Sequence, residues 1–334
     1  MTIPLVRAHG SHGDAGAAIG AAAAETIRQA AVGPFDVELA ERFRAVSVEH
    51  LPWVVEELDA AAEAAGADPL AVFAASVEEL ASPSFVATGC SDLVVTGERT
   101  ADGHLLVAHN NDLEASLEEH VVAVEWRVDG EPTIFTLGIG PWLSVGWNDA
   151  GLSVTGNELT PADDRVGIPR LLQMRDVVTR RTVLEAIEAI LHPARASSYN
   201  WVLAHRDGAV ANVEGSATAS AVTEPVDGAV AHANDYRDPD MRRFEANPRA
   251  ADSAKRCERA ERLLAETAGE PLTLARLREL LSDHDGAPDS LCRHRDHEGV
   301  KTVFWCVADV TAGRVVYGRG NPCESDAQTY SFAA

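Results

Sequence analysis

The stretch Gly89-Cys90-Ser91-Asp92-Leu93-Val94-Val95-Thr96 marks the point where the sequence changes from helical to strand-like patterning. The residues before it are rich in alanine, and their apolar positions recur at helical spacing. Pro52 predicts a break in the second helix, and Asp68-Pro69 supplies an N-cap and a first-turn proline for the third. Three helices are therefore expected before the cysteine, over residues 17–31, over residues 35–65 and from Asp68 onward.

From Cys90 onward, the apolar period is two, and turn signals separate the strands. Asp102-Gly103 and Asp129-Gly130 each lie between two strand-like runs, as in a β-hairpin. This order has no β-α-β alternation, so it predicts an α+β protein with layered antiparallel sheets and helices outside them. Strands are expected over residues 92–96, 104–110, 120–128, 133–137, 143–147, 152–155, 200–204, 210–213, 220–223, 230–233, 301–308 and 314–317, and helices over residues 168–178, 183–191, 251–266 and 274–282.

The length and the charge limit the class of protein. A chain of 334 residues can form one compact unit with a large core, or one such unit preceded by a helical segment. The formal net charge of -24 disfavours nucleic acid and anionic lipid surfaces as partners. No apolar run resembles a signal peptide or a membrane span, so a cytoplasmic location is expected. The odd number of cysteines, 5, argues against a disulfide framework.

Gly89-Cys90 is a candidate self-cleavage site. Glycine lacks a Cβ, so its carbonyl is accessible to the next thiol, and a cysteine that becomes an N-terminus carries both a nucleophile and an amine base. Cross-strand pairing would bring the Asp112 carboxylate beside that amine. The side-chain amides of Asn157 and Asn234, each at a strand end, are candidate donors to an oxyanion. The alternatives are an inert buried cysteine, a solvated turn aspartate and two strand-end caps.

Four segments of the chain carry a resemblance to a known family. They are Thr88-Gly89-Cys90-Ser91, Ala108-His109-Asn110-Asn111-Asp112, Asn148-Asp149-Ala150-Gly151-Leu152-Ser153 leading to Asn157, and His232-Ala233-Asn234-Asp235. In this order they resemble the N-terminal-nucleophile hydrolases of the isopenicillin N acyltransferase family, to which penicillin V acylase and conjugated bile acid hydrolase are similar. The likeness extends from about residue 85 to the C-terminus, and the helical segment before it resembles the acyltransferase pro-part.

The resemblance implies a four-layer αββα sandwich and autocatalytic cleavage between Gly89 and Cys90. The products would be a helical chain of residues 1–89 and a catalytic chain of residues 90–334, which stay associated as one integrated domain. The implied roles are the nucleophile, the carboxylate that holds its amine, and two oxyanion donors, carried by Cys90, Asp112, Asn157 and Asn234 in that order.

The expected activity is hydrolysis of a linear N-acyl amide, a small-molecule substrate, through a thioester on Cys90 and without a cofactor. Two alternatives stay open: transfer of the acyl group to an amine acceptor, and a non-catalytic small-molecule-binding protein in which Cys90 is inert. For the tryptophans of the candidate substrate pocket, core packing is the competing interpretation. That pocket comprises His109, Asn111, Trp147, Glu158 and Trp201.

Two positions depart from the pattern of the family. His109 stands where the bile acid and penicillin V enzymes carry an arginine, so their way of tuning the thiol does not transfer directly. The acyltransferase has an arginine ahead of the last hairpin, and no arginine stands at the matching position near Lys301. Lys301 itself or Arg293 is a candidate substitute.

The stretch Cys292-Arg293-His294-Arg295-Asp296-His297 contains one cysteine and two histidines, which are side chains that bind metals. A fourth ligand is not evident from the sequence, and the arginines would repel a cation. A polar loop exposed to solvent accounts for these residues without a bound ion, so no metal is expected.

Overall fold

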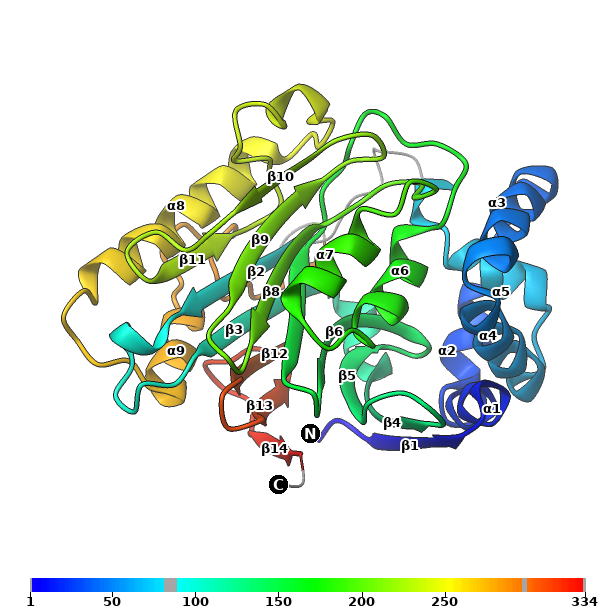
Figure 1. Ribbon diagram of the computed structural model, residues 1–334, viewed down its shortest axis with the longest axis horizontal. Helices are drawn as coiled ribbons and strands as arrows, with labels where there is room; N and C mark the ends of the chain where they lie inside the picture. Colours follow the sequence, from blue (N-terminus) through cyan, green and yellow to red (C-terminus); the bar gives the residue numbers. More distant parts are fainter. Residues whose placement is uncertain (1, 81–88, 296–298, 333–334) are drawn as a thin grey trace.

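The chain folds into two stacked β-sheets with helices on both outer faces (Figure 1). The computed structural model describes residues 2–80, 89–295 and 299–332. The first sheet has eight strands in the order β1 (Leu5–Gly10), β4 (Val121–Val128), β5 (Ile134–Ile139), β6 (Trp142–Asn148), β7 (Leu152–Asn157), β8 (Asn200–His205), β9 (Val210–Gly215) and β10 (Ser220–Thr223). The second has six, in the order β11 (Ala229–His232), β2 (Gly89–Val95), β3 (Leu106–Glu114), β12 (Val300–Asp309), β13 (Arg314–Arg319) and β14 (Gln328–Ser331).

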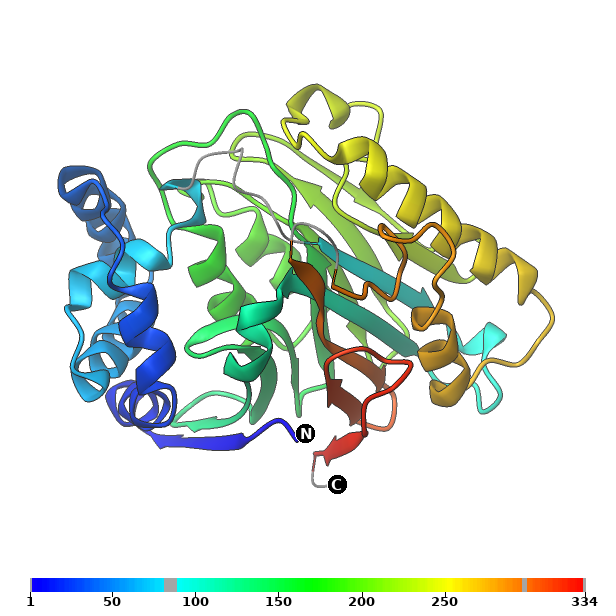
Figure 2. The same ribbon diagram turned by 180° about the vertical axis from the view of Figure 1, so that it is seen from behind.

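The helices form the two outer layers. An apolar cluster joins α1 (His12–Ala22), α6 (Arg170–Val177) and α7 (Val183–Ile190) to the eight-stranded sheet. A second cluster joins α8 (Ala250–Glu266) and α9 (Leu274–Leu281) to the six-stranded sheet, and Figure 2 shows this face. Four more helices lie beside α1 and α6, namely α2 (Ala24–Ala30), α3 (Val37–His50), α4 (Pro52–Ala65) and α5 (Pro69–Ala75).

Part of the layer between the two sheets is an apolar cluster with large side chains from both. Phe135 and Trp147 of the first sheet contact Phe304 and Tyr317 of the second within one buried cluster. The alternation of side chains along each strand therefore buries one face of each sheet against the other sheet and the opposite face against helices. This confirms the predicted α+β class and the αββα layers. Among the described residues, no helix combines the length and the apolar character that crossing a bilayer needs.

The N-terminal segment differs from the prediction in two respects, because it contains a strand and because one predicted helix is divided. Residues 5–10 form β1, which pairs in parallel with β4, so that Leu5 lies opposite Ala123. The predicted helix over residues 17–31 is divided at Ala23. The break at Pro52 and the cap at Asp68, which accepts a hydrogen bond from the backbone nitrogen of Ala71, are confirmed. The expected punctuation and extended lead-in before the cysteine, residues 82–88, lie outside the described residues.

Close packing of α1 on α4 depends on two glycines. A Cβ on Gly16 would lie 2.1 Å from the carbonyl oxygen of Glu57, and one on Gly20 would lie 2.2 Å from that of Ala61. Atoms cannot approach so closely, so any larger side chain forces the two helices apart.

Gly20→Ala is expected to lower the free energy of unfolding by about 1–3 kcal/mol, because the new methyl group overpacks the contact between α1 and α4. Urea denaturation measures this change. Gly33→Ala is the matched control, because a Cβ on Gly33 meets nothing within 4 Å. Equal stability of the two variants would contradict the packing argument.

Candidate functional site

The register between β2 and β3 decides which side chains lie around Cys90. Cys90 lies opposite Asn111, and Gly89 lies opposite Asp112. Because successive side chains point to opposite faces of a strand, Cys90 and Asn111 share a face with Val94, which packs against the other sheet. Gly89 and Asp112 lie on the opposite face, which α8 and α9 cover. The cysteine side chain therefore points between the sheets, while its backbone nitrogen is near groups from the helical side.

Cys90 lines a pocket of ≈ 90 Å³ whose walls come from both sheets, from α6 and from Glu78. The side chain is largely buried, with 7% of its surface exposed, as expected for a thiol at the base of such a pocket. Two residues of the predicted substrate pocket, Asn111 and Glu158, line it together with the predicted oxyanion donor Asn157. The remaining lining residues are Glu78, Leu113, Leu143, Ser144, Gly156, Leu171, Met174 and Tyr199.

His109 lies beneath this pocket and is fully buried. Its Nδ1 lies 3.2 Å from each carboxylate oxygen of Asp92, and its Nε2 has no hydrogen-bond partner among the described residues. Burial alone would lower the pKa of His109, but the Asp92 carboxylate and, to a smaller extent, the Cys90 thiol outweigh it and raise the pKa to about 10. The imidazole is therefore positively charged at neutral pH.

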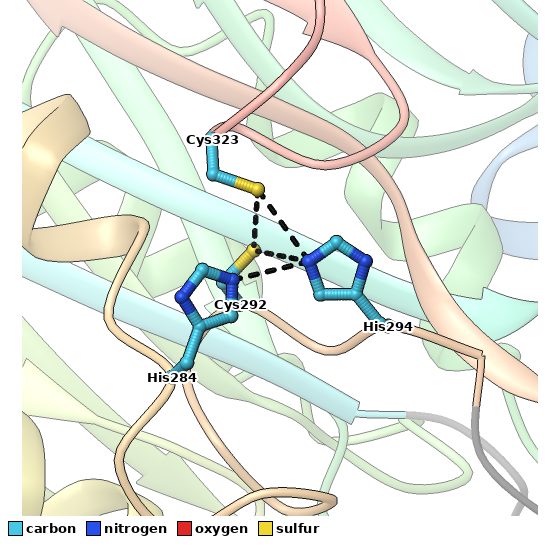
Figure 3. A group of neighbouring side chains, drawn as sticks. All are labelled: His284, Cys292, His294 and Cys323. Carbon is cyan, nitrogen blue, oxygen red and sulfur yellow. Dashed lines mark hydrogen bonds between the residues drawn. The ribbon is translucent and has the colours of Figure 1, made fainter.

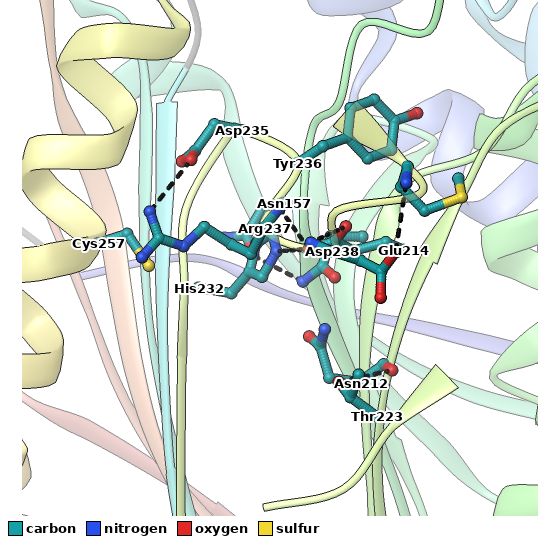
Figure 4. A network of polar contacts seen from close by, with 12 residues as sticks. Asn157, Asn212, Glu214, Thr223, His232, Asp235, Tyr236, Arg237, Asp238 and Cys257 are labelled. Carbon is teal, nitrogen blue, oxygen red and sulfur yellow. Dashed lines mark hydrogen bonds and ion pairs between the residues drawn. The ribbon is translucent and has the colours of Figure 1, made fainter. Parts of the chain in front are cut away.

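Asn157 connects Cys90's strand to the eight-stranded sheet. Its Nδ2 donates a hydrogen bond of 2.8 Å to Oδ2 of Asp92. Its Oδ1 accepts one of 3.0 Å from Asn200 and lies 3.2 Å from Nδ1 of His232. His232 in turn lies 2.8 Å from Oε1 of Glu214, and Figure 4 shows this network. These contacts fix the Asn157 amide at the wall of the pocket, with one N–H directed to Asp92.

Asn234 holds the backbone of the cysteine. Its Oδ1 accepts a hydrogen bond of 2.8 Å from the Cys90 nitrogen and one of 2.6 Å from Nη2 of Arg256. Its Nδ2 donates to the carbonyl oxygen of Glu158 at 3.1 Å, and its backbone nitrogen donates to Oγ of Ser253. The Asn234 side chain is therefore fixed at both ends, with its oxygen toward the cysteine nitrogen.

Gly89 is enclosed by charged groups on the helical side. A Cβ at this position would lie 3.1 Å from Nη1 of Arg293, 3.2 Å from Oδ2 of Asp112 and 3.4 Å from Nη2 of Arg256. Oδ1 of Asp112 accepts a hydrogen bond of 2.7 Å from Thr302. Burial raises the pKa of Asp112 above its ordinary value, although the two guanidinium groups oppose the shift. The Gly89-Cys90 peptide bond is thus adjacent to one buried carboxyl group and two buried cations.

Several predicted residues lie away from this site. Trp147 packs against Phe135 in the cluster between the sheets, and Trp201 is buried in the cluster beneath α6 and α7, so neither lines the pocket around Cys90. Both tryptophans therefore pack in the core, which was the alternative to a place in the substrate pocket. Nζ of Lys301 lies 2.7 Å from Glu118, so of the two candidate substitutes for the missing arginine only Arg293 lies beside Gly89.

Sequence reasoning missed two residues of the site. Asp92 follows Cys90 by two positions, which puts both side chains on the same strand face, and this spacing was a usable signal. Arg256 lies on α8 among other charged residues, and nothing local distinguishes it.

A comparison with known protein families identifies the family of this chain. The family model described as acyl-coenzyme A:6-aminopenicillanic acid acyl-transferase matches residues 99–324. This range includes Asp112, Asn157 and Asn234 and begins after Cys90. No curated protein matches.

The solved structures that are similar to this chain include the following three. A variant of conjugated bile acid hydrolase from Clostridium perfringens has a TM-score of 0.51 at 14% identity, over 73% of this chain and 97% of that one. An N-acylethanolamine-hydrolyzing acid amidase ortholog from Caenorhabditis elegans has a TM-score of 0.48 at 16% identity, over 66% and 93%. Penicillin V acylase from Agrobacterium tumefaciens has a TM-score of 0.43 at 13% identity, over 72% and 86%. The first of these likenesses shows a shared fold.

Proposed function

Because the chain belongs to the acyl-coenzyme A:6-aminopenicillanic acid acyl-transferase family, we propose that it is a cysteine amidohydrolase activated by cleavage between Gly89 and Cys90. Its fold is that of the N-terminal-nucleophile hydrolases. The chain is an enzyme that acts on amide bonds, as a hydrolase or as an acyltransferase. The proposal adds the nucleophile, the cleavage and the preference for hydrolysis.

The observation that carries the proposal is where the side chain and the backbone nitrogen of Cys90 lie. The Cys90 side chain lines the pocket, while its nitrogen lies 2.8 Å from Oδ1 of Asn234. Once the bond to Gly89 is cut, this nitrogen becomes an α-amine, which titrates near about 8 and can accept the thiol proton. The Asp112 carboxyl group beside Gly89 supplies the negative charge that such an ammonium group needs.

Cleavage of the precursor needs a different way to form the thiolate, because the free amine does not yet exist. The charged His109 imidazole, held by Asp92, stabilises a thiolate on Cys90. The sulfur attacks the carbonyl carbon of Gly89, the C–N bond breaks, and the Cys90 nitrogen takes a proton to become the amine. Water then hydrolyses the resulting thioester and releases Gly89 as a carboxylate.

Substrate turnover repeats these steps on an external amide. The thiolate attacks the substrate carbonyl, the amine product leaves with a proton, and water hydrolyses the acyl-thioester on Cys90. Asn157 and Asn234 each present an amide nitrogen with two N–H groups, one of which donates to Asp92 and to the Glu158 carbonyl, respectively. We assign the second N–H of each to the developing oxyanion.

Transfer of the acyl group to an amine acceptor is the second candidate, and the description of the matching family favours it. The two reactions differ only in whether water or an amine attacks the thioester. A screen of N-acyl amines and N-acyl amino acids, with and without an added amine, separates released acid from transferred product. Acid released at a rate that the amine does not change would support hydrolysis, and a dominant transfer product would contradict it.

We also propose that the two chains stay associated after cleavage. The pairing of β1 with β4 supports this, because it makes residues 5–10 an edge strand of the larger sheet. Arg175 of α6 adds a buried bidentate ion pair with Glu57 of α4, with distances of 3.0 and 2.8 Å. Size-exclusion chromatography followed by intact mass measurement under denaturing conditions should give one peak that contains both fragments.

His109→Gln is expected to reduce kcat/KM at neutral pH by about 10²-fold, because the Cys90 thiolate loses its positively charged neighbour. The pH at which the thiol becomes reactive toward iodoacetamide should rise in the same variant. His104→Gln is the matched control, since His104 also lies beside a buried carboxylate, 2.9 Å from Oδ2 of Asp309, but Cys90 affects the pKa of His109 and not that of His104. An unchanged alkylation profile in His109→Gln would contradict the assignment.

A further inference from the structure

Four metal-binding side chains converge at the surface beside the six-stranded sheet (Figure 3). His284, Cys292 and His294 come from the segment between α9 and β12, and Cys323 comes from the segment between β13 and β14. One ligand atom from each lies within 4.8 Å of every other. Cys292 is buried and the other three are exposed.

Four of the six separations between these atoms are close to the edges of a tetrahedron around a zinc ion, and the other two are within 4.8 Å. Zn–S bonds of about 2.3 Å and Zn–N bonds of about 2.0–2.1 Å imply edges of about 3.8 Å for S–S, about 3.6 Å for S–N and about 3.3 Å for N–N. The Sγ atoms of Cys292 and Cys323 lie 3.6 Å apart, and Nε2 of His294 lies 3.9 and 3.5 Å from them. Nε2 of His284 lies 3.1 Å from Nε2 of His294.

We propose that His284, Cys292, His294 and Cys323 form a structural Cys₂His₂ zinc site. Two thiolates and two imidazoles are the donor set that selects zinc over hard cations such as magnesium or calcium. Four protein ligands fill the coordination sphere, so the site is structural and not catalytic. The two thiols lose their protons on binding, and their two negative charges balance the ion.

A neighbouring residue supports one ligand. Asn321 is buried, and its Nδ2 donates to Sγ of Cys292 at 3.3 Å and to the carbonyl oxygen of Arg293 at 2.8 Å. A donor aimed at a cysteine sulfur stabilises the thiolate and orients it, as outer-shell partners do at metal sites.

The proposed site differs from the expectation, drawn from the sequence, that no metal binds here. Two of the four ligands lie outside the stretch 292–297, namely His284, which precedes it, and Cys323, which lies 31 positions after Cys292. The guanidinium of Arg293 is directed elsewhere, 3.4 Å from Oδ1 of Asp289 and beside Gly89. Asp296 and His297, which belonged to the original motif, lie outside the described residues.

The position of the proposed site indicates that the metal orients Arg293. Arg293 lies between the ligands Cys292 and His294, and its side chain contacts the Gly89 environment described above. A zinc ion that joins the segments at 284–294 and 323 would therefore hold Arg293 in place against Asp112. In this respect the ion acts on the candidate active site through a positioning residue.

The full-length protein, refolded or dialysed without metal and then titrated with zinc, is expected to bind one zinc ion per chain in competition with a chromophoric chelator. Zinc content after gel filtration measures the stoichiometry, and cobalt in place of zinc should show thiolate-to-metal charge-transfer absorption. Removal of the metal should lower the thermal midpoint by roughly 5–10 °C.

Cys323→Ser and His294→Ala should each weaken zinc binding by at least about 10-fold. Cys257→Ser is the matched control, because Cys257 is a buried thiol on α8 outside the cluster, and it should retain the metal. Cys90→Ala should also retain it, so the zinc site and the proposed catalysis can fail independently. Failure of wild-type apoprotein to bind zinc, or a Cys292–Cys323 disulfide in fresh protein by mass spectrometry, would overturn the proposal.

Discussion

A chain with alanine in place of Cys90 is expected to fold, to remain one uncut species of 334 residues, and to have no amidase activity. In the proposal, only the Cys90 thiol attacks a carbonyl carbon. Its removal should therefore abolish both the cleavage of the precursor and the turnover of substrate. The loss of activity should reach the background of the assay, because no thioester can form. Intact mass measurement under denaturing conditions and an N-acyl amide assay provide the two readouts.

The control for this variant is Cys257→Ala, which removes a buried thiol outside the pocket. It should be cleaved into residues 1–89 and 90–334 and keep its activity. Near-ultraviolet circular dichroism should show that both variants are folded. Cleavage of Cys90→Ala at the same bond would refute the nucleophile, and so would an active wild-type enzyme whose Gly89-Cys90 bond is intact.

The second large effect is expected for Asn234→Ala, which should lower kcat by about 10² to 10³-fold. The variant loses the amide that holds the Cys90 nitrogen at 2.8 Å and, in the proposal, one donor to the oxyanion. Arg256 also loses its hydrogen bond of 2.6 Å to that amide, which leaves a buried guanidinium less well held. Processing of the precursor should slow together with turnover, because both reactions pass through the same oxyanion.

Asn212→Ala is the matched control for Asn234→Ala. Asn212 is a similarly buried asparagine on β9, but its Oδ1 has no hydrogen-bond partner among the described residues, whereas Oδ1 of Asn234 accepts from the Cys90 nitrogen. Steady-state kinetics on pre-cleaved protein separate the effect on kcat from the effect on processing. Wild-type turnover in Asn234→Ala would show that the oxyanion donor is another residue.

The elements with a regular local pattern could be predicted from the sequence. The alternation after Cys90 and the turn signals gave the hairpins β2–β3, β4–β5 and β12–β13, which the structure contains. β1 was missed because residues 5–10 have no clean alternation, and their parallel partner β4 lies more than a hundred residues away. Long-range pairing of this kind leaves no trace in a short window of sequence.

The residues of the candidate site also fall into two groups, those with a local signal in the sequence and those without one. Asp112 was predicted beside the cysteine because both lie in one hairpin, whose register follows from the turn. Arg256 and Cys323 reach their sites through tertiary packing of α8 and of the segment after β13, so neither has a local signal. Trp147 and Trp201 were candidates for the substrate pocket with core packing as the alternative, and both side chains are buried in the core.

The parallel pairing of β1 with β4 has a consequence for how the mature enzyme can be handled. In the precursor this strand joins the sheet while still covalently tethered, so its docking is an intramolecular event. After the proposed cut, the same contact must form between two separate molecules, and renaturation becomes bimolecular. Heating or denaturant should therefore inactivate the processed enzyme irreversibly at low protein concentration, whereas Cys90→Ala should recover its native spectrum at any dilution.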